Sequence, residues 1–164
     1  MPLIGEYEPS VWPDARDQVT LYEETDGAQG NLLMGLPVVI ITTTGKATGS
    51  VRKTPVMRIE HEGVYAAVAS MSGAPSNPGW YHNMKASPLV ELQDGAVRQD
   101  YTARELDGPE REIWWTRAVG AFAAYADYAT ATTRRIPVML LEPRVPSPEP
   151  RFGQAWGSLS VTPS

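Results

Sequence analysis

The chain has 164 residues, of which 42% are hydrophobic and 20% are charged, and its formal net charge is -5. This length suits a single domain with a buried core, and the composition is that of an ordinary soluble globular protein. Proteins that bind nucleic acid need a basic surface, so the acidic balance argues against nucleic acid as a partner. The absence of cysteine excludes disulfides and thiolate chemistry and is compatible with the cytoplasm.

No apolar run approaches the roughly 20 residues of a membrane-spanning helix. The N-terminus also lacks the basic and apolar regions of a signal peptide. We therefore predict a cytoplasmic protein without a transmembrane segment, and peripheral association with a membrane stays open. The two histidines are not part of a helical pair of metal ligands, so no metal site is predicted.

The first 13 residues contain three prolines and are predicted to be irregular. Asp14 is placed to cap a helix that ends near residue 24, with Val19 and Tyr22 on its inner side. A loop rich in glycine and asparagine then leads to a continuous apolar run, residues 37–41, which is typical of a buried strand.

Alternation of apolar residues and turn signals predict six strands, at about residues 38–44, 54–60, 64–70, 89–93, 97–103 and 136–142. The dipeptide Asp94-Gly95 is a strong hairpin signal between the fourth and fifth strands. Three further helices are predicted at 79–86, 107–124 and 125–132. Asp107 is the expected cap of the second of these, whose inward residues are expected to be Ile113, Trp114, Val119 and Phe122.

These elements predict a mainly β protein with helices. Most strands follow one another through short turns, whereas helices are inserted between the third and fourth strands and between the fifth and sixth. This arrangement is typical of a small antiparallel barrel. We expect one barrel domain over residues 14–143, after an irregular segment, 1–13, and before a tail rich in proline and serine, 144–164.

The stretch from Thr42 to Pro55 has the composition of an anion-binding turn. Hydroxyl residues follow the buried strand, and the cations Lys46, Arg52 and Lys53 lie near two glycines. Glycine permits close approach of a ligand, successive backbone N–H groups can form a concave nest of donors, and the cations add charge. The turn therefore indicates either a site for a small anion or an ordinary hairpin with solvated charges.

Several separated segments together resemble the deazaflavin-dependent nitroreductase family, whose members are split β-barrel proteins that bind coenzyme F-420. Their order and spacing carry the resemblance, which covers roughly residues 12–143. The segments are Ile41-Thr42-Thr43-Thr44-Gly45, Arg52-Lys53-Thr54-Pro55, Ala69-Ser70, Gly73-Ala74-Pro75, Asn77-Pro78, Trp80-Tyr81-His82-Asn83, Tyr125-Ala126-Asp127-Tyr128 and Thr133-Arg134-Arg135-Ile136-Pro137-Val138.

The resemblance implies an α+β fold, a six-stranded antiparallel split β-barrel with flanking helices. It also implies an oxidoreductase in which reduced F-420 passes a hydride to an electrophilic small molecule, such as a quinone, an enone or a nitroaromatic. The phosphate and oligoglutamate tail of the coenzyme would run over the stretch from Thr42 to Pro55, which we call the basic turn. The implied coenzyme-binding residues are Thr43, Thr44, Gly45, Lys46, Arg52, Lys53, Pro55, Ala69, Ser70, Gly73, Ala74, Trp80 and Asn83. The implied catalytic residues, which would hydrogen-bond the substrate oxygen, are Ser70, Tyr125 and Tyr128.

Packing roles compete with some of these assignments. An aromatic residue on a short helix, such as Trp80, is often a packing residue. Tyr125 and Tyr128 share one face of a helix, either as donors to a substrate or as part of a core stripe. For Arg134 and Arg135 we predict a structural role, through pairing with acidic neighbours.

Two departures from the family pattern bear on the coenzyme. The family usually has Gly-Arg-Lys-Ser-Gly after the threonines, whereas this chain replaces the arginine with Lys46 and the lysine with Ala47. Ser72 also replaces the first of two glycines in the loop after the third strand. The changed turn keeps a non-catalytic deazaflavin carrier or sensor as an alternative. A split-barrel protein that binds FMN is another alternative, although the chain lacks a denser arginine and serine clamp for the FMN phosphate. The expected assembly is a monomer or a homodimer.

Overall fold

The computed structural model describes residues 3, 5–10, 12–74 and 76–144. Within these residues the helices are α1 (Pro13–Glu24), α2 (Gly79–Ala86), α3 (Gly108–Ala121) and α4 (Ala124–Ala131), together with a 3-10 turn, η1 (Met71–Gly73). The strands are β1 (Leu32–Leu33), β2 (Leu36–Thr44), β3 (Val51–Met57), β4 (Glu60–His61), β5 (Val64–Val68), β6 (Leu89–Asp94), β7 (Val97–Glu105) and β8 (Val138–Pro143).

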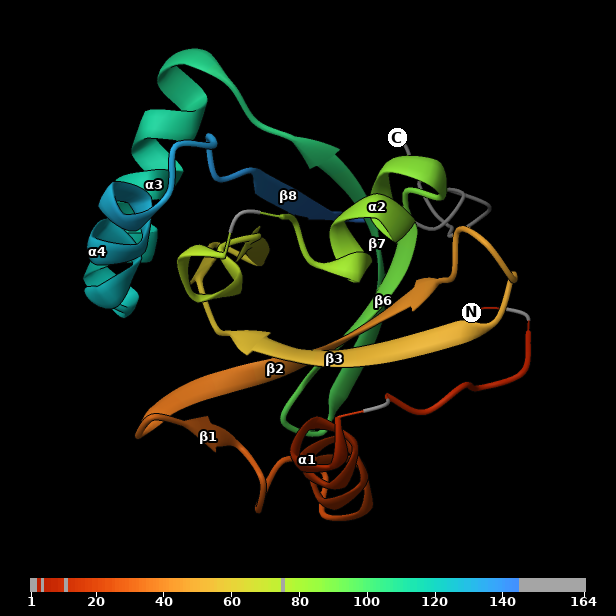
Figure 1. Cartoon of the computed structure of the whole chain (residues 1–164). Helices are drawn as coiled ribbons and strands as arrows, with labels where there is room; N and C mark the ends of the chain where they lie inside the picture. The colour runs from red at the N-terminus through yellow and green to blue at the C-terminus, as the bar shows by residue number, and fades with distance from the viewer. Residues whose placement is uncertain (1–2, 4, 11, 75, 145–164) are drawn as a thin grey trace, which may run out of the picture.

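These strands form one antiparallel sheet that curls into a half-barrel (Figure 1). Hydrogen-bonded neighbours run in the order β1–β2–β6–β7–β8–β5–β4, and β3 pairs with β2. The predicted antiparallel split barrel with flanking helices is therefore confirmed. Among the described residues the sheet has eight strands rather than six, because β1 and β4 are two-residue strands that are too short to produce a sequence pattern.

The central strand β2 separates two apolar cores. Its residues from Val38 to Ile41 are all 1–2% exposed. Successive side chains of a strand point to opposite faces, so Val38 and Ile40 join one core cluster, and Val39 and Ile41 join the other. A continuous apolar run is what a strand covered on both faces requires.

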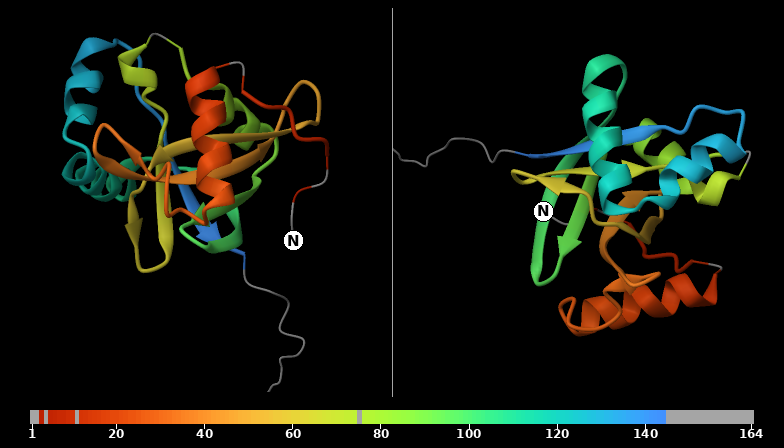
Figure 2. Two further views of the ribbon diagram at one scale, coloured as in Figure 1. Left: turned by 90° about the horizontal axis from the view of Figure 1, so that it is seen from below. Right: turned by 90° about the vertical axis from the view of Figure 1, so that its left-hand side faces the viewer.

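The helices cover different parts of the sheet. α1 packs on β3 and buries Val19 and Tyr22, as predicted, while α2 packs on β2 and β7. α3 and α4 lie together, away from α1, and α4 also contacts η1 (Figures 1 and 2). The loop around η1 consequently lies between the sheet and α4.

Strand β3 begins at Val51 rather than near Thr54, which corrects the prediction for this strand. The N–H of Val51 donates to the carbonyl of Glu6 (2.7 Å), and the carbonyl of Val51 accepts from the N–H of Glu8 (2.9 Å). The ladder with β2 also continues through Lys53, Arg52 and Val51, so pairing on both sides extends the strand towards the turn. Arg52 consequently lies within a strand rather than in a flexible turn.

Other predicted boundaries also change. Trp12, not Asp14, occupies the cap position of α1, because Pro13 takes the first helical position, where no N–H donor is needed. Ile113 is 53% exposed, so its predicted inward position is wrong, whereas Trp114 is buried. The chain leaves the α3 axis at Phe122 and begins α4 at Ala124. Of the predicted tail, residues 145–164 lie outside the described residues.

Candidate active site

The basic turn is closed by its own backbone. The N–H of Gly45 donates to the carbonyl of Ser50 (2.6 Å), and the N–H of Gly49 donates to the carbonyl of Gly45 (2.9 Å). The N–H of Ser50 donates to Thr48 Oγ1 (3.1 Å). These amides are therefore engaged, and the predicted nest of free backbone donors is not formed by them. The donors that the turn can offer to an anion are therefore mainly side chains.

Helix α2 anchors this turn through Asn83. The N–H of Lys46 donates to Asn83 Oδ1 (2.9 Å), and Asn83 Nδ2 donates to Thr43 Oγ1 (3.2 Å). Thr43 is 1% exposed. Asn83 thereby links a buried strand hydroxyl to the rim of the turn and fixes where the backbone of Lys46 lies.

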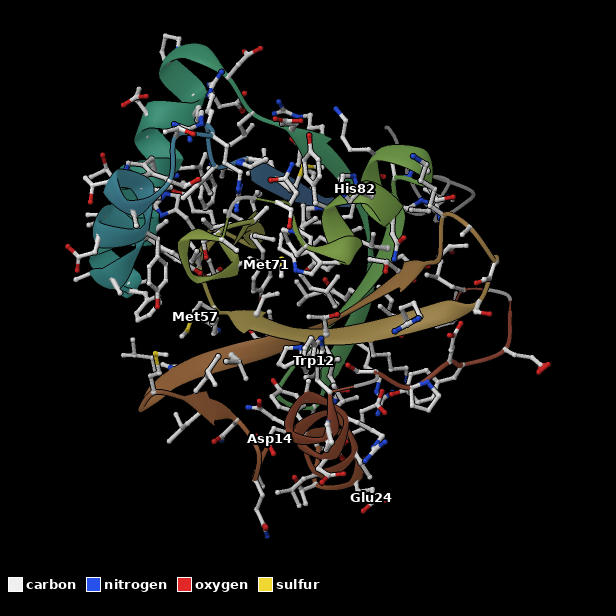
Figure 3. The ribbon with its side chains drawn as sticks, viewed as in Figure 1. Trp12, Asp14, Glu24, Met57, Met71 and His82 are labelled. Atoms are coloured by element: carbon white, nitrogen blue, oxygen red, sulfur yellow. The ribbon has the colours of Figure 1, made fainter. Side chains whose placement is uncertain are left out.

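A cavity of about 520 Å3 lies beside the basic turn, within the size range of small-molecule sites. One wall is the β2–β3 hairpin and another is the start of α2. The N-terminal segment and the first turn of α1 supply a third wall, with Trp12 at the start of the helix (Figure 3). The lining residues are Glu8, Ser10, Trp12, Ala15, Gly45, Lys46, Ala47, Thr48, Arg52, Lys53, Thr54, Met71, Pro78, Gly79, Trp80 and Asn83.

The cations of this larger cavity differ in their partners. Arg52 Nη1 lies 3.2 Å from Glu8 Oε2, and Lys53 pairs with Glu23. The ammonium of Lys53 also lies 5.1 Å from the ring centroid of Tyr7, a cation–π distance. Lys46 is exposed and makes no ion pair with any residue that the structure describes.

A smaller cavity of about 200 Å3 adjoins the larger one, and Met71, Pro78 and Trp80 line both. Its walls come from β3, the loop after β5, α4 and the loop between β1 and β2. The other lining residues are Leu33, Met34, Pro55, Val56, Met57, Val68, Ser70, Phe122, Tyr125 and Tyr128. Most of these side chains are apolar, so this cavity suits an uncharged organic molecule.

Tyr125 combines packing with access to the smaller cavity. It is 4% exposed, and its ring centroid lies 4.9 Å from that of Phe122 and 6.4 Å from that of Tyr128. Burial raises the pKa of the Tyr125 phenol above its usual range, and the neighbouring Tyr128 adds to this shift. The phenol therefore stays protonated at neutral pH. Neither phenol is hydrogen-bonded to another described residue, which leaves both as donors facing the cavity.

Arg134 fixes the loop that carries Ser70. Its guanidinium donates to the carbonyls of Ala69 (3.1 Å), Ser70 (2.8 Å) and Ala74 (2.8 Å) and to Asn77 Oδ1 (2.6 Å). The structural role predicted for Arg134 is confirmed, although its partners are amide oxygens rather than acidic side chains. These bonds hold Ser70 at the smaller cavity.

The same loop packs tightly on α4. A Cβ on Gly73, which has φ 81°, would lie 3.3 Å from the Tyr128 carbonyl oxygen and from the Ala131 Cβ, so glycine is needed here. Met71 has φ 44°, a left-handed conformation that is uncommon for a residue with a side chain. The loop therefore places Met71 at the junction of the two cavities at some cost in backbone strain.

The predicted site residues fall into three groups. Those that line the larger cavity are Gly45, Lys46, Arg52, Lys53, Trp80 and Asn83. Those that line the smaller cavity are Pro55, Ser70, Trp80, Tyr125 and Tyr128. Those that line neither cavity are Thr43, Thr44, Ala69, Gly73 and Ala74.

Sequence reasoning missed the wall made by the N-terminal segment. Glu8, Ser10 and Trp12 line the larger cavity although residues 1–13 carry no periodic pattern. A tryptophan in an otherwise polar segment was the available signal. Leu33 and Met34 at the smaller cavity were also missed, because a two-residue strand leaves no pattern around them.

Two further features of the described residues bear on the type of protein. Every helix within the described ranges is too short or too polar to cross a membrane. The same residues contain no group of three or more histidine or acidic side chains that could hold a metal ion.

The curled half-barrel carries a cationic cavity joined to an apolar, tyrosine-lined one, an arrangement typical of proteins that bind small organic ligands. The family model described as F420H(2)-dependent quinone reductase matches residues 14–143. A quinone reductase of that description from Mycobacterium tuberculosis is 34% identical over 128 residues, which are 76% of this chain and 86% of that protein. The chain therefore belongs to the F420H(2)-dependent quinone reductase family.

Solved structures agree with this assignment. The structure of an F420-H2 dependent reductase matches with a TM-score of 0.62 and 52% sequence identity, over 65% of this chain and 94% of that one. A structure described as a domain-swapped dimer matches with a TM-score of 0.65 and 47% identity, over 77% of this chain and 96% of that one. The predictions of an oxidoreductase and of F420 as its cofactor are confirmed at the level of the family.

Proposed function

We propose that the protein reduces a quinone-type substrate with reduced F420, with the coenzyme in the larger cavity and the substrate in the smaller one. The observation that carries this proposal is the junction of a cationic cavity with an apolar cavity through Met71, Pro78 and Trp80. A donor and an acceptor bound on the two sides would be neighbours, as direct transfer requires. The bound coenzyme supplies the hydride.

The larger cavity has the donors that the coenzyme needs. Lys46, Arg52 and Lys53 lie on its basic side and would hold the phosphate and the anionic tail. The indole of Trp80 lies at the junction with the smaller cavity and offers a flat apolar surface for the ring system. Asn83 acts through the turn, because its amide is bonded to Lys46 and Thr43.

Donors to the substrate oxygen would come from the smaller cavity. A quinone that accepts a hydride carries two added electrons, and its oxygen then needs one proton to give the hydroquinone. Hydroxyl groups fixed beside that oxygen would stabilise the developing negative charge more than the ground state. We assign this role to Tyr125 and Tyr128, with Ser70 as a third donor. Tyr125, whose pKa is raised by burial, is neutral at physiological pH and can donate a hydrogen bond to that oxygen.

Membership of the family favours F420 over FMN, and an enzyme over a carrier. Enones and nitroaromatics remain predicted further acceptors, because an apolar cavity with hydroxyl donors would accept them as well as quinones. The decisive experiment titrates the protein with F420 and with FMN and then measures anaerobic oxidation of reduced F420 by a water-soluble quinone. F420 binding with quinone-dependent turnover is expected. Tight binding without turnover would favour the carrier.

We also propose that residues 14–143 form one domain in each chain, that two chains form a homodimer, and that the protein is cytoplasmic. The dimer is supported by the similar structure described as a domain-swapped dimer. The location is supported by the absence of cysteine. Light scattering at several protein concentrations tests the dimer, and cell fractionation tests the location, including any association with membranes.

A further inference from the structure

A short N-terminal strap, residues 5–10, crosses the rim of the larger cavity. The strap is bonded to the start of β3 through the backbone of Glu6, Glu8 and Val51, and Tyr7 forms a parallel bridge with Val51. A Cβ on Gly5, which has φ 139°, would lie 2.8 Å from the carbonyl oxygen of Gly49. The strap therefore runs in close contact with the basic turn.

The strap places the carboxylate of Glu8 beside the guanidinium of Arg52. Glu8 Oε2 lies 3.2 Å from Arg52 Nη1, and both side chains line the larger cavity. The Glu8 side chain is 48% exposed and that of Arg52 is 32% exposed, so the pair is open to solvent and to ligands. An ion pair of this exposure is weak and can be exchanged for another anion.

We propose that Glu8 competes with the anionic group of the ligand for Arg52, so that the strap lowers and tunes the affinity of the larger cavity for its coenzyme. The inference rests on the proposed function, because it concerns the ligand of that cavity. In the free protein Glu8 occupies Arg52, and the phosphate or a tail carboxylate of the coenzyme takes its place on binding. Glu8 then turns outward, and the loss of its ion pair with Arg52 opposes binding.

Glu8 fits this role better than the second acidic partner in the site. Glu23 pairs with Lys53 on side chains that are 22% and 18% exposed, and Glu23 belongs to α1, which packs on β3. Arg98 lies 3.9 Å from Glu23 and shares it. The Glu23–Lys53 pair thus belongs to the packed interface between α1 and β3. Glu8, in contrast, belongs to the strap and not to a helix or a long strand. The exchangeable anion of the cavity is therefore Glu8.

The test is a titration of wild type, E8Q, E6Q, R52A and the E8Q/R52A double variant with F420. E6Q is the matched control, because it removes the same charge from the same strap while the exposed Glu6 side chain makes no ion pair with the described residues. A deazaflavin nucleoside without phosphate serves as the neutral ligand. Each titration is run in low and in high salt, since partly exposed charges are screened.

E8Q is expected to bind F420 about two- to fivefold more tightly than wild type, the effect of one exposed ion pair. E6Q should match wild type, the nucleoside should bind all variants alike, and the gain should vanish in high salt. In the R52A background E8Q should bring no gain, because the competition needs Arg52. The inference is overturned if E8Q gains nothing, if E6Q gains as much, or if the gain persists without Arg52.

Failure of the proposed function gives a different result. If wild type binds no F420 at all, the coenzyme assignment fails, and the Glu8 inference is then decided with inorganic pyrophosphate. Binding would be followed by the fluorescence of Trp12 and Trp80, which line the cavity. Tighter pyrophosphate binding by E8Q than by E6Q supports the competition, and equal affinities overturn it.

Discussion

Replacing Tyr125 by phenylalanine tests the assigned chemistry most directly. The change removes one hydroxyl from the smaller cavity and leaves a ring that is 4% exposed and packs 4.9 Å from the Phe122 centroid. Because that hydroxyl is not hydrogen-bonded to any described residue, its loss breaks no internal hydrogen bond. The free energy of unfolding should therefore change by less than about 1 kcal/mol.

The expected effect on turnover is much larger. Removal of one donor from an oxyanion-type site typically costs about a hundredfold in rate, and water in the cavity can replace part of the lost donation. We therefore expect Tyr125→Phe to lower turnover at least about tenfold, which corresponds to roughly 1.4 kcal/mol. Affinity for F420 should stay the same, because Tyr125 does not line the larger cavity.

The assay combines steady-state oxidation of reduced F420 by a water-soluble quinone, coenzyme titration and thermal unfolding. Tyr128→Phe is the matched partner, since its phenol lines the same cavity in a less buried position. If both variants turn over like wild type, the tyrosines are packing residues and the proton comes from water or Ser70. A joint loss of stability and coenzyme affinity would show that the core-stripe interpretation is correct.

Four other outcomes are expected. Arg52→Ala should weaken F420 binding by about 1.5 kcal/mol, the low end for a charged hydrogen bond because Glu8 already occupies the guanidinium. Unchanged affinity at low salt would contradict this. Ala47→Lys adds a cation to the lining of the larger cavity and should tighten F420 binding by up to about 1 kcal/mol in the same titration, unless the tail passes elsewhere. Arg134→Ala should lower the free energy of unfolding by about 2–4 kcal/mol, because it leaves the oxygens of its loop without their donor, and a denaturant melt with Arg135→Ala as the exposed control checks it. Burial raises the pKa of Tyr125 in the folded protein above its pKa in the unfolded chain. The contribution of the neutral phenol to stability is therefore fully present below about pH 10 and is lost as the pH rises through the folded pKa. Tyr125→Phe should reduce the loss of stability between pH 10 and 12.

The sequence determined the class of fold and most of the cationic side of the site. The apolar run before the basic turn predicts a strand covered on both faces, and Val38 to Ile41 are buried in two cores as that pattern requires. Pro88 and the Pro78-Gly79 boundary placed α2 at its observed residues, 79–86. These features depend on local steric and hydrophobic rules, which act over a few residues and are therefore visible in the sequence.

The tertiary structure decided which side chains share a cavity and which are already engaged. Long-range pairing brings the N-terminal segment onto β3, and this places Glu8 on Arg52 although the two residues are 44 positions apart by their numbers. It also uses the turn amides and the side chain of Asn83 internally, which no local pattern reports. Contacts between segments distant in the chain depend on how the sheet curls and how helices pack on it. Only the folded chain therefore shows which side chains line each cavity and which of them already have an internal partner.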